Sequence, residues 1–161
     1  MGLRAGWVVR IALWSGTGAP TYIDAHEGQI TGLVGFAGGL ASVGAALRLR
    51  LWSSAGAPAG QTQLSAPASG LASGGEALFL ASPDGTLRRI VPDTAPDTAP
   101  DTAPVEAACR TGLLAVASGA GMVAAAGTTG EVWLLDPVML ETRAGPTLHG
   151  IFGRRIGTAP R

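Results

Sequence analysis

The chain has 161 residues, a formal net charge of zero, and only 14% charged residues. This length allows one domain with a hydrophobic core, and the charge balance excludes a polybasic nucleic-acid-binding arm or an acidic tail. Because the only cysteine, Cys109, can form no internal disulfide, we expect a reducing, intracellular location, cytoplasmic or nuclear.

The first predicted strand is apolar and spans residues 6–14, GWVVRIALW. Turn residues follow it, and TYIDAHEG then supplies a short outer strand and a loop that carries His26. These N-terminal residues lack the pattern of a secretory signal. A later run, residues 112–127, is too short and too rich in Ala and Gly to span a bilayer, so we expect no membrane segment.

The second segment contains four predicted strands, at residues 30–36, 40–44, 47–52 and 61–65, with the first innermost and the last at a polar outer edge. In the third of these, leucine alternates with Arg48, Arg50 and Trp52. This alternation places the leucines on one face of the strand and the other three residues on the opposite face.

A third, more compact segment has predicted strands at residues 68–73, 77–81 and 86–91, with the turn sequence SPDG before the last of them. The tetrapeptide DTAP then occurs three times at residues 93–104, which predicts an exposed, mobile loop with no role in the core. Its threonines are candidate modification sites, although slippage of a repetitive gene segment explains the repeat more simply.

The last segment is interpreted as strands at residues 105–108, 112–117, 122–126 and 131–136. We expect a further outer strand near residues 147–152, and a polar tail at 154–161.

These segments repeat one another. RIALWSGTGAP at residues 10–20 matches RLRLWSSAGAP at 48–58, an offset of 38, and the DTAP insertion lengthens the next interval to 45. A period of about 40 residues with four short strands is typical of a propeller blade. We therefore predict an all-β fold, a partial β-propeller of about three and a half four-stranded antiparallel blades. It covers residues 1–153, with units at about 6–28, 29–66, 67–110 and 111–153.

The units resemble Trp-Asp (WD) repeats, in which a histidine, a serine, a tryptophan and a turn aspartate form a structural hydrogen-bond set. Six residues match such positions and are expected to be structural: Trp14, His26, Ser42, Trp52, Asp84 and Asp136. The second unit also matches the family at Ile30 and Leu33 but has Ala46 at the turn aspartate, the third has Ile90 at the tryptophan, and the fourth has Thr129 at the turn. No unit therefore has the complete set.

The resemblance implies a non-catalytic protein-interaction scaffold with protein partners and no cofactor, and nucleic acid is not an expected partner. Propellers typically close with four to eight blades, so the blade count predicts a fragment of a larger propeller. A self-completing dimer is the alternative, because an open array leaves strand edges unpaired.

Arginines supply the other candidate binding site. Arg10, Arg48 and Arg88 lie near the start of third strands and would gather on one rim of a radial array. Guanidinium groups there could hold phosphate or an acidic peptide. The alternative function is thus an RNA- or phospho-ligand-binding module of a larger ribonucleoprotein or regulatory ATPase assembly. Pairing of each arginine within its own blade is the simpler interpretation.

Catalytic chemistry has little support. The glycine-rich sequence at residues 119–124 resembles a dinucleotide-binding fingerprint, but the turn at residues 127–130 leaves no room for the helix that such a site requires. The two histidines, His26 and His149, have no partner with catalytic spacing, and Cys109 fits a small buried hydrophobe better than a nucleophile. No cluster of metal ligands is evident, so we predict no enzymatic activity.

Overall fold

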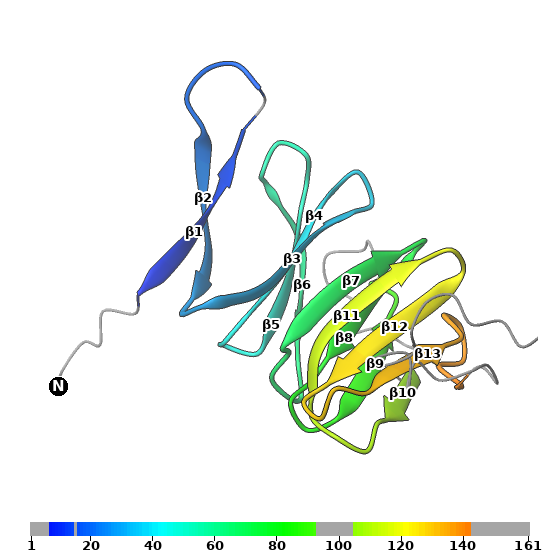
Figure 1. Cartoon of the computed structure of the whole chain (residues 1–161). Helices are drawn as coiled ribbons and strands as arrows, with labels where there is room; N and C mark the ends of the chain where they lie inside the picture. Colours follow the sequence, from blue (N-terminus) through cyan, green and yellow to red (C-terminus); the bar gives the residue numbers. More distant parts are fainter. Residues whose placement is uncertain (1–6, 15, 93–104, 143–161) are drawn as a thin grey trace, which may run out of the picture.

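The structure, a computed structural model, describes residues 7–14, 16–92 and 105–142. All regular structure in these ranges is β-strand, in four antiparallel sheets (Figure 1). The first sheet pairs β1 (Val8–Leu13) with β2 (Thr21–Glu27). The second sheet has the order β3 (Ile30–Phe36), β4 (Gly39–Gly44), β5 (Arg48–Trp52) and β6 (Pro58–Gln63).

The third sheet contains β7 (Gly70–Gly74), β8 (Ala77–Ala81), β9 (Thr86–Ile90) and β10 (Val105–Ala108) in that order. The fourth contains β11 (Leu113–Gly119), β12 (Met122–Gly127) and β13 (Val132–Leu135). The all-β class and the partial-propeller architecture predicted from the sequence are thus confirmed, since consecutive antiparallel sheets follow one another along the chain.

Two strand predictions need correction. The strand at residues 105–108 is predicted as the first strand of the last segment, although it falls within the unit bounds 67–110. β10 pairs with β9 and is the outer strand of the third sheet, which corrects the strand assignment. The DTAP segment separates the two strands in sequence and conceals that they are neighbours. The outer strand predicted at residues 61–65 is β6, which begins earlier, at Pro58, and ends at Gln63. The next residue, Leu64, is buried in the core and does not continue the polar edge. The predicted DTAP loop, the outer strand near 147–152 and the polar tail lie outside the described residues.

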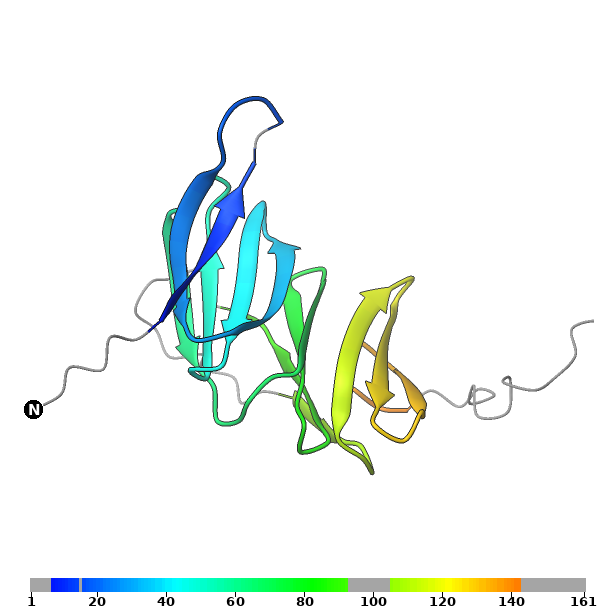
Figure 2. The same ribbon diagram turned by 60° about the vertical axis from the view of Figure 1, so that its left-hand side comes forward.

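The four sheets are arranged side by side, as the two views show (Figures 1 and 2). The first strands of the last three sheets, β3, β7 and β11, contact one another in succession and form the inner edge of the array. Hydrophobic clusters fill the spaces between successive sheets. They centre on Ile11, Ala25 and Trp52 between the first two sheets, and on larger apolar sets at the next two interfaces. All five residues of β8 are buried, because the third sheet packs on both faces.

Strand register confirms that the sequence repeat is a structural one. Leu40 pairs with Trp52 in the second sheet, and the residues 38 positions later, Leu78 and Ile90, pair in the third. An offset of 45 then brings Leu78 to Val123, which pairs with Leu135 in the fourth sheet. Equivalent positions in different sheets can therefore be compared residue by residue.

Candidate functional site

A buried polar network joins the first two sheets. His26 of β2, Ser42 of β4 and Trp52 of β5 are 2%, 0% and 5% exposed. The indole Nε1 of Trp52 donates to the Ser42 hydroxyl oxygen at 2.8 Å, and the same oxygen lies 2.8 Å from His26 Nε2. Because an indole N–H can only donate, Ser42 accepts from Trp52 and can give its own hydrogen to His26. The neutral imidazole then carries its hydrogen on Nδ1.

The surroundings of His26 favour its neutral form. Burial lowers the pKa of the imidazole most strongly, and the positive charge of Arg50 lowers it further. A hydrogen bond to the backbone of Ser42 acts in the opposite direction, and Arg48 adds a smaller lowering. Space for the ring comes from Gly44, where an added Cβ would lie 2.7 Å from the imidazole. His26 therefore holds two sheets together and is not an accessible base.

The same three positions are apolar at the next two interfaces. At the offset of 38, the equivalents are Leu64, Leu80 and Ile90, all buried in one hydrophobic cluster. At the third interface they are Cys109, Ala125 and Leu135. A shared backbone hydrogen bond supports the equivalence of Leu64 and Cys109, since Leu64 N donates to Leu47 O and Cys109 N donates to Gly85 O. Among the three described interfaces between sheets, the first is thus the one with a polar centre.

Cys109 packs partly buried against the third cluster and lines a pocket of about 600 Å³ between β10 and β13. Burial raises the pKa of its thiol, which disfavours the reactive thiolate. This environment agrees with a small hydrophobic residue rather than a nucleophile.

The two aspartates among the predicted structural positions stabilise turns. Asp84 Oδ1 accepts a hydrogen bond from Thr86 N at 2.8 Å in the turn before β9. Asp136 Oδ1 accepts from Val138 N at 2.8 Å and from Met139 N at 3.1 Å, just after β13. None of these three bonds joins a histidine, serine or tryptophan. The interface between the first two sheets thus holds three members of the family's set, and the third sheet holds only the turn aspartate.

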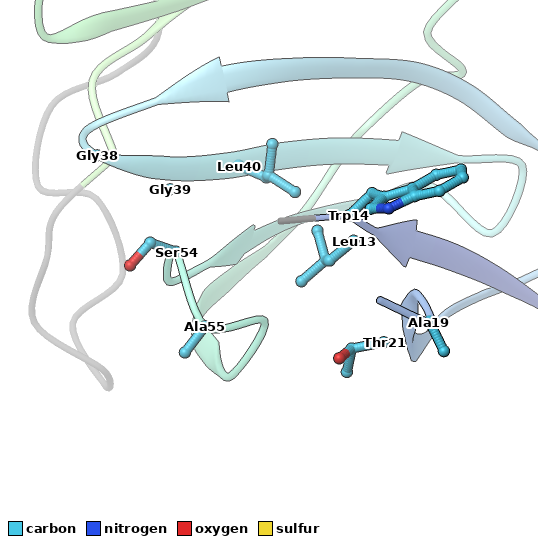
Figure 3. A pocket seen from close by; sticks show the side chains of 9 residues that line it. All are labelled: Leu13, Trp14, Ala19, Thr21, Gly38, Gly39, Leu40, Ser54 and Ala55. Atoms are coloured by element: carbon cyan, nitrogen blue, oxygen red, sulfur yellow. The ribbon is translucent and has the colours of Figure 1, made fainter. Parts of the chain in front are cut away.

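Trp14 has a different environment from Trp52, its repeat equivalent. The first sheet has only two strands among the described residues, so no strand equivalent to β4 offers a serine to the indole. The Trp14 side chain is 73% exposed. It lines a pocket of about 380 Å³ together with residues of both sheets (Figure 3): Leu13, Ala19, Thr21, Gly38, Gly39, Leu40, Ser54 and Ala55.

This Trp14 pocket is formed by the end of β1, the start of β2, the turn into β4, and the loop between β5 and β6 (Figure 3). None of its lining residues is charged. Trp7, just before β1, and Tyr22 of β2 are also well exposed, at 88% and 60%. Exposed aromatic side chains of this kind offer a large apolar area with a polar group, which suits contact with another protein.

The three predicted rim arginines do not form one positive cluster. Arg10 makes an ion pair with Asp24 at 2.7 Å, and Arg88 makes one with Glu106 at 2.6 Å. In both pairs the acid stands directly opposite the arginine on the outer strand. Arg48 is exposed and has no ion pair among the described residues. The simpler interpretation of the sequence, in which each arginine pairs within its own sheet, therefore describes two of the three arginines.

The glycine-rich sequence at 119–124 forms the hairpin between β11 and β12. Its turn residues Ala120 and Gly121 both have positive φ, at 49° and 69°. A strand follows the glycines where a dinucleotide site would need a helix. Within the described ranges, no three His, Cys, Asp or Glu side chains are placed to share a metal ion, and no helix there could span a bilayer. His149 lies outside these ranges.

No protein-family model and no curated protein matches the sequence. Solved structures do match the fold. The WD40 repeats of RRP9 align over 74% of this chain and 38% of theirs, at 13% identity and a TM-score of 0.61. The Neurospora crassa Pan2 WD40 domain aligns over 76% and 38%, at 15% identity and a TM-score of 0.60. BamB from Moraxella catarrhalis aligns over 88% and 45%, at 17% identity and a TM-score of 0.65.

The chain spans less than half the length of each of these structures. The predicted resemblance to WD-repeat propellers is confirmed at the level of the fold, and identities this low carry no information on partners or activity.

Proposed function

We propose that this chain is a non-catalytic protein-interaction module whose main contact surface is the Trp14 pocket. The observation that carries the proposal is an exposed tryptophan that lines an uncharged pocket between the first two sheets. Tryptophan and tyrosine dominate the binding energy of many interfaces because they bury large areas at low entropic cost. WD40 structures with the same fold support a scaffold role in general.

A selection from a displayed library of random peptides would test this function without a known partner. The target is the full chain, and enriched peptides are then measured against two variants by fluorescence anisotropy. We expect Trp14→Ala to weaken binding at least tenfold, the loss of a typical aromatic anchor. Trp7→Ala removes a tryptophan that is even more exposed but does not line the pocket, and it should have little effect. Peptides that bind both variants equally, or no enrichment at all, would contradict the proposal.

We further propose that the chain is part of a larger propeller. Two features support this: the short span relative to the matching structures, and an edge of β1 that has no pairing strand among the described residues. Light scattering on the purified chain would separate the possibilities. A β-rich species of twice the chain mass would favour the self-completing dimer, whereas an aggregate or an unfolded monomer would favour missing blades.

A role in binding RNA or a phosphate-bearing ligand has less support, because Arg10 and Arg88 are already neutralised by carboxylates. Binding that weakens steeply with salt would favour it, since phosphate contacts release counterions. We also propose an intracellular location, cytoplasmic or nuclear, on the basis of the single cysteine, and a fluorescent fusion would test it.

A further inference from the structure

The second sheet breaks a charge pattern that its neighbours keep. Arg10 in β1 stands opposite Asp24, and Arg88 in β9 stands opposite Glu106. Their repeat equivalents at the offset of 38 are Arg48 and Arg50, both in β5. In the register of the second sheet, Arg48 stands opposite Gln63 and Arg50 stands opposite Gln61. Each arginine of β5 thus has a neutral amide where its equivalent has a carboxylate.

The two arginines of β5 lie on one face of the strand, because alternate residues share a face. Arg48 is exposed and Arg50 is half-buried. Arg50 Nη1 donates to Ala25 O at 2.6 Å, which directs its guanidinium toward the first sheet. Its Nε is buried and has no hydrogen-bond partner among the described residues.

A half-buried guanidinium without an acid is costly, because partial burial removes water and no opposite charge replaces it. His26, whose pKa Arg50 lowers, is neutral or positive and supplies no negative charge. Neither ion pair found among the described residues involves β5. A carboxylate brought by a partner would supply what Asp24 and Glu106 supply in the adjacent sheets.

We propose that Arg48 and Arg50, flanked by Gln61 and Gln63, form a binding site for an acidic segment of a partner protein. Planar guanidinium groups bind carboxylates with two parallel hydrogen bonds, and the glutamine amides can donate further ones. The inference rests on the proposed interaction function in one respect, namely that the ligand is a segment of a protein. The site differs from the Trp14 pocket in both residues and chemistry, so each can be tested without the other.

Hexaglutamate with a fluorescent label is a suitable probe, titrated into the full chain and followed by anisotropy at low ionic strength. Arg48→Gln should weaken its binding roughly three- to tenfold, the range for one partly exposed charged hydrogen bond. Arg10→Gln is the matched control, because it changes the net charge equally at the equivalent position, where the arginine is already paired. It should change binding less than about twofold.

A second variant keeps both arginines. Gln63→Glu places a carboxylate opposite Arg48, in the arrangement that Arg10 and Asp24 already have. It should weaken hexaglutamate binding as much as Arg48→Gln does and leave the unfolding midpoint unchanged or higher. This variant tests the inference even if removal of an arginine disturbs the fold.

Three results would overturn the inference: no hexaglutamate binding, equal weakening by the Arg10 and Arg48 substitutions, or binding of inorganic phosphate in place of the peptide. The first two would show that β5 has no specific site, and the third would indicate a small-anion site. Trp14→Ala should leave hexaglutamate binding unchanged. A failed library selection would therefore contradict the proposed function without affecting this result.

Discussion

Replacing Ser42 with alanine should be among the most destabilising single substitutions in the first interface. The hydroxyl of Ser42 is the shared partner of His26 and Trp52, at 2.8 Å from each. Alanine would leave Nε2 of His26 and Nε1 of Trp52 buried without a partner. Each unsatisfied buried polar group costs about 1 to 3 kcal/mol. With two such groups we expect a loss of about 2 to 6 kcal/mol in the free energy of unfolding, a large share of the stability of a typical domain.

Ser82 provides the matched control. It is also a buried serine, 1% exposed, but its hydroxyl has no hydrogen-bond partner among the described residues. Ser82→Ala removes an unsatisfied polar atom, so the free energy of unfolding should change by less than about 0.5 kcal/mol or increase.

Urea unfolding followed by circular dichroism measures both serine variants. The dependence of the free energy on urea should stay unchanged, because the surface exposed on unfolding is the same. Similar losses for the two variants, or a loss below about 1 kcal/mol for Ser42→Ala, would refute the argument that the network carries this stability.

Three further predictions concern acid, a turn and a close contact. The pKa of His26 is lower in the folded chain than its unfolded value of about 6.5, so the neutral ring contributes its full stability above that pH and progressively less as the pH falls toward the folded pKa. Urea unfolding between about pH 7.5 and 5 should therefore show a steeper fall in the free energy of unfolding for the native chain than for His26→Gln. Ala120→Gly should raise the free energy of unfolding by about 1 kcal/mol, because Ala120 has a φ of 49°, a left-handed conformation that glycine adopts without strain. Ala117→Gly, on the exposed face of β11, should lower it by roughly 0.5 to 1 kcal/mol, because glycine loses more backbone freedom in a strand than alanine does. A change of the same sign in both thermal midpoints would contradict the turn argument. Gly39→Ala should lower the free energy of unfolding by about 2 to 4 kcal/mol, several times the effect of either alanine substitution, since an added Cβ would overlap the carbonyl oxygen of Trp52. A near-native thermal midpoint would be incompatible with that contact.

The repeat and the alternation of apolar residues were enough to predict most strands. The first inner strand was predicted at residues 30–36 and β3 has those bounds, because glycines and turn residues mark its ends. The partner of β10 could not be predicted, since pairing across an insertion depends on contacts distant in sequence. The resemblance marks His26, Ser42 and Trp52 as structural positions, and the hydrogen bonds that join them across two sheets are seen only in the structure.

The candidate binding residues were harder to predict. Whether an arginine is paired depends on the register between a third strand and its outer strand, and Asp24 and Glu106 lie 14 and 18 positions from their partners. That Arg48 and Arg50 have no carboxylate opposite them becomes clear only when the register places Gln63 and Gln61 there. The exposure of Trp14 was also not predictable, because its sequence context matches that of a buried tryptophan.

The sheets pack mainly on their immediate neighbours, and this succession has a consequence for cooperativity. In a linear array, stability is close to a sum of unit and nearest-neighbour terms, so damage at one interface does not spread evenly. Loss of the hydrogen-bonded first interface should release β1 and β2 while the cluster around Phe79 stays packed. Amide hydrogens of β8, enclosed on both faces, should exchange last, and the molecule should lose its structure in steps from the first sheet inward.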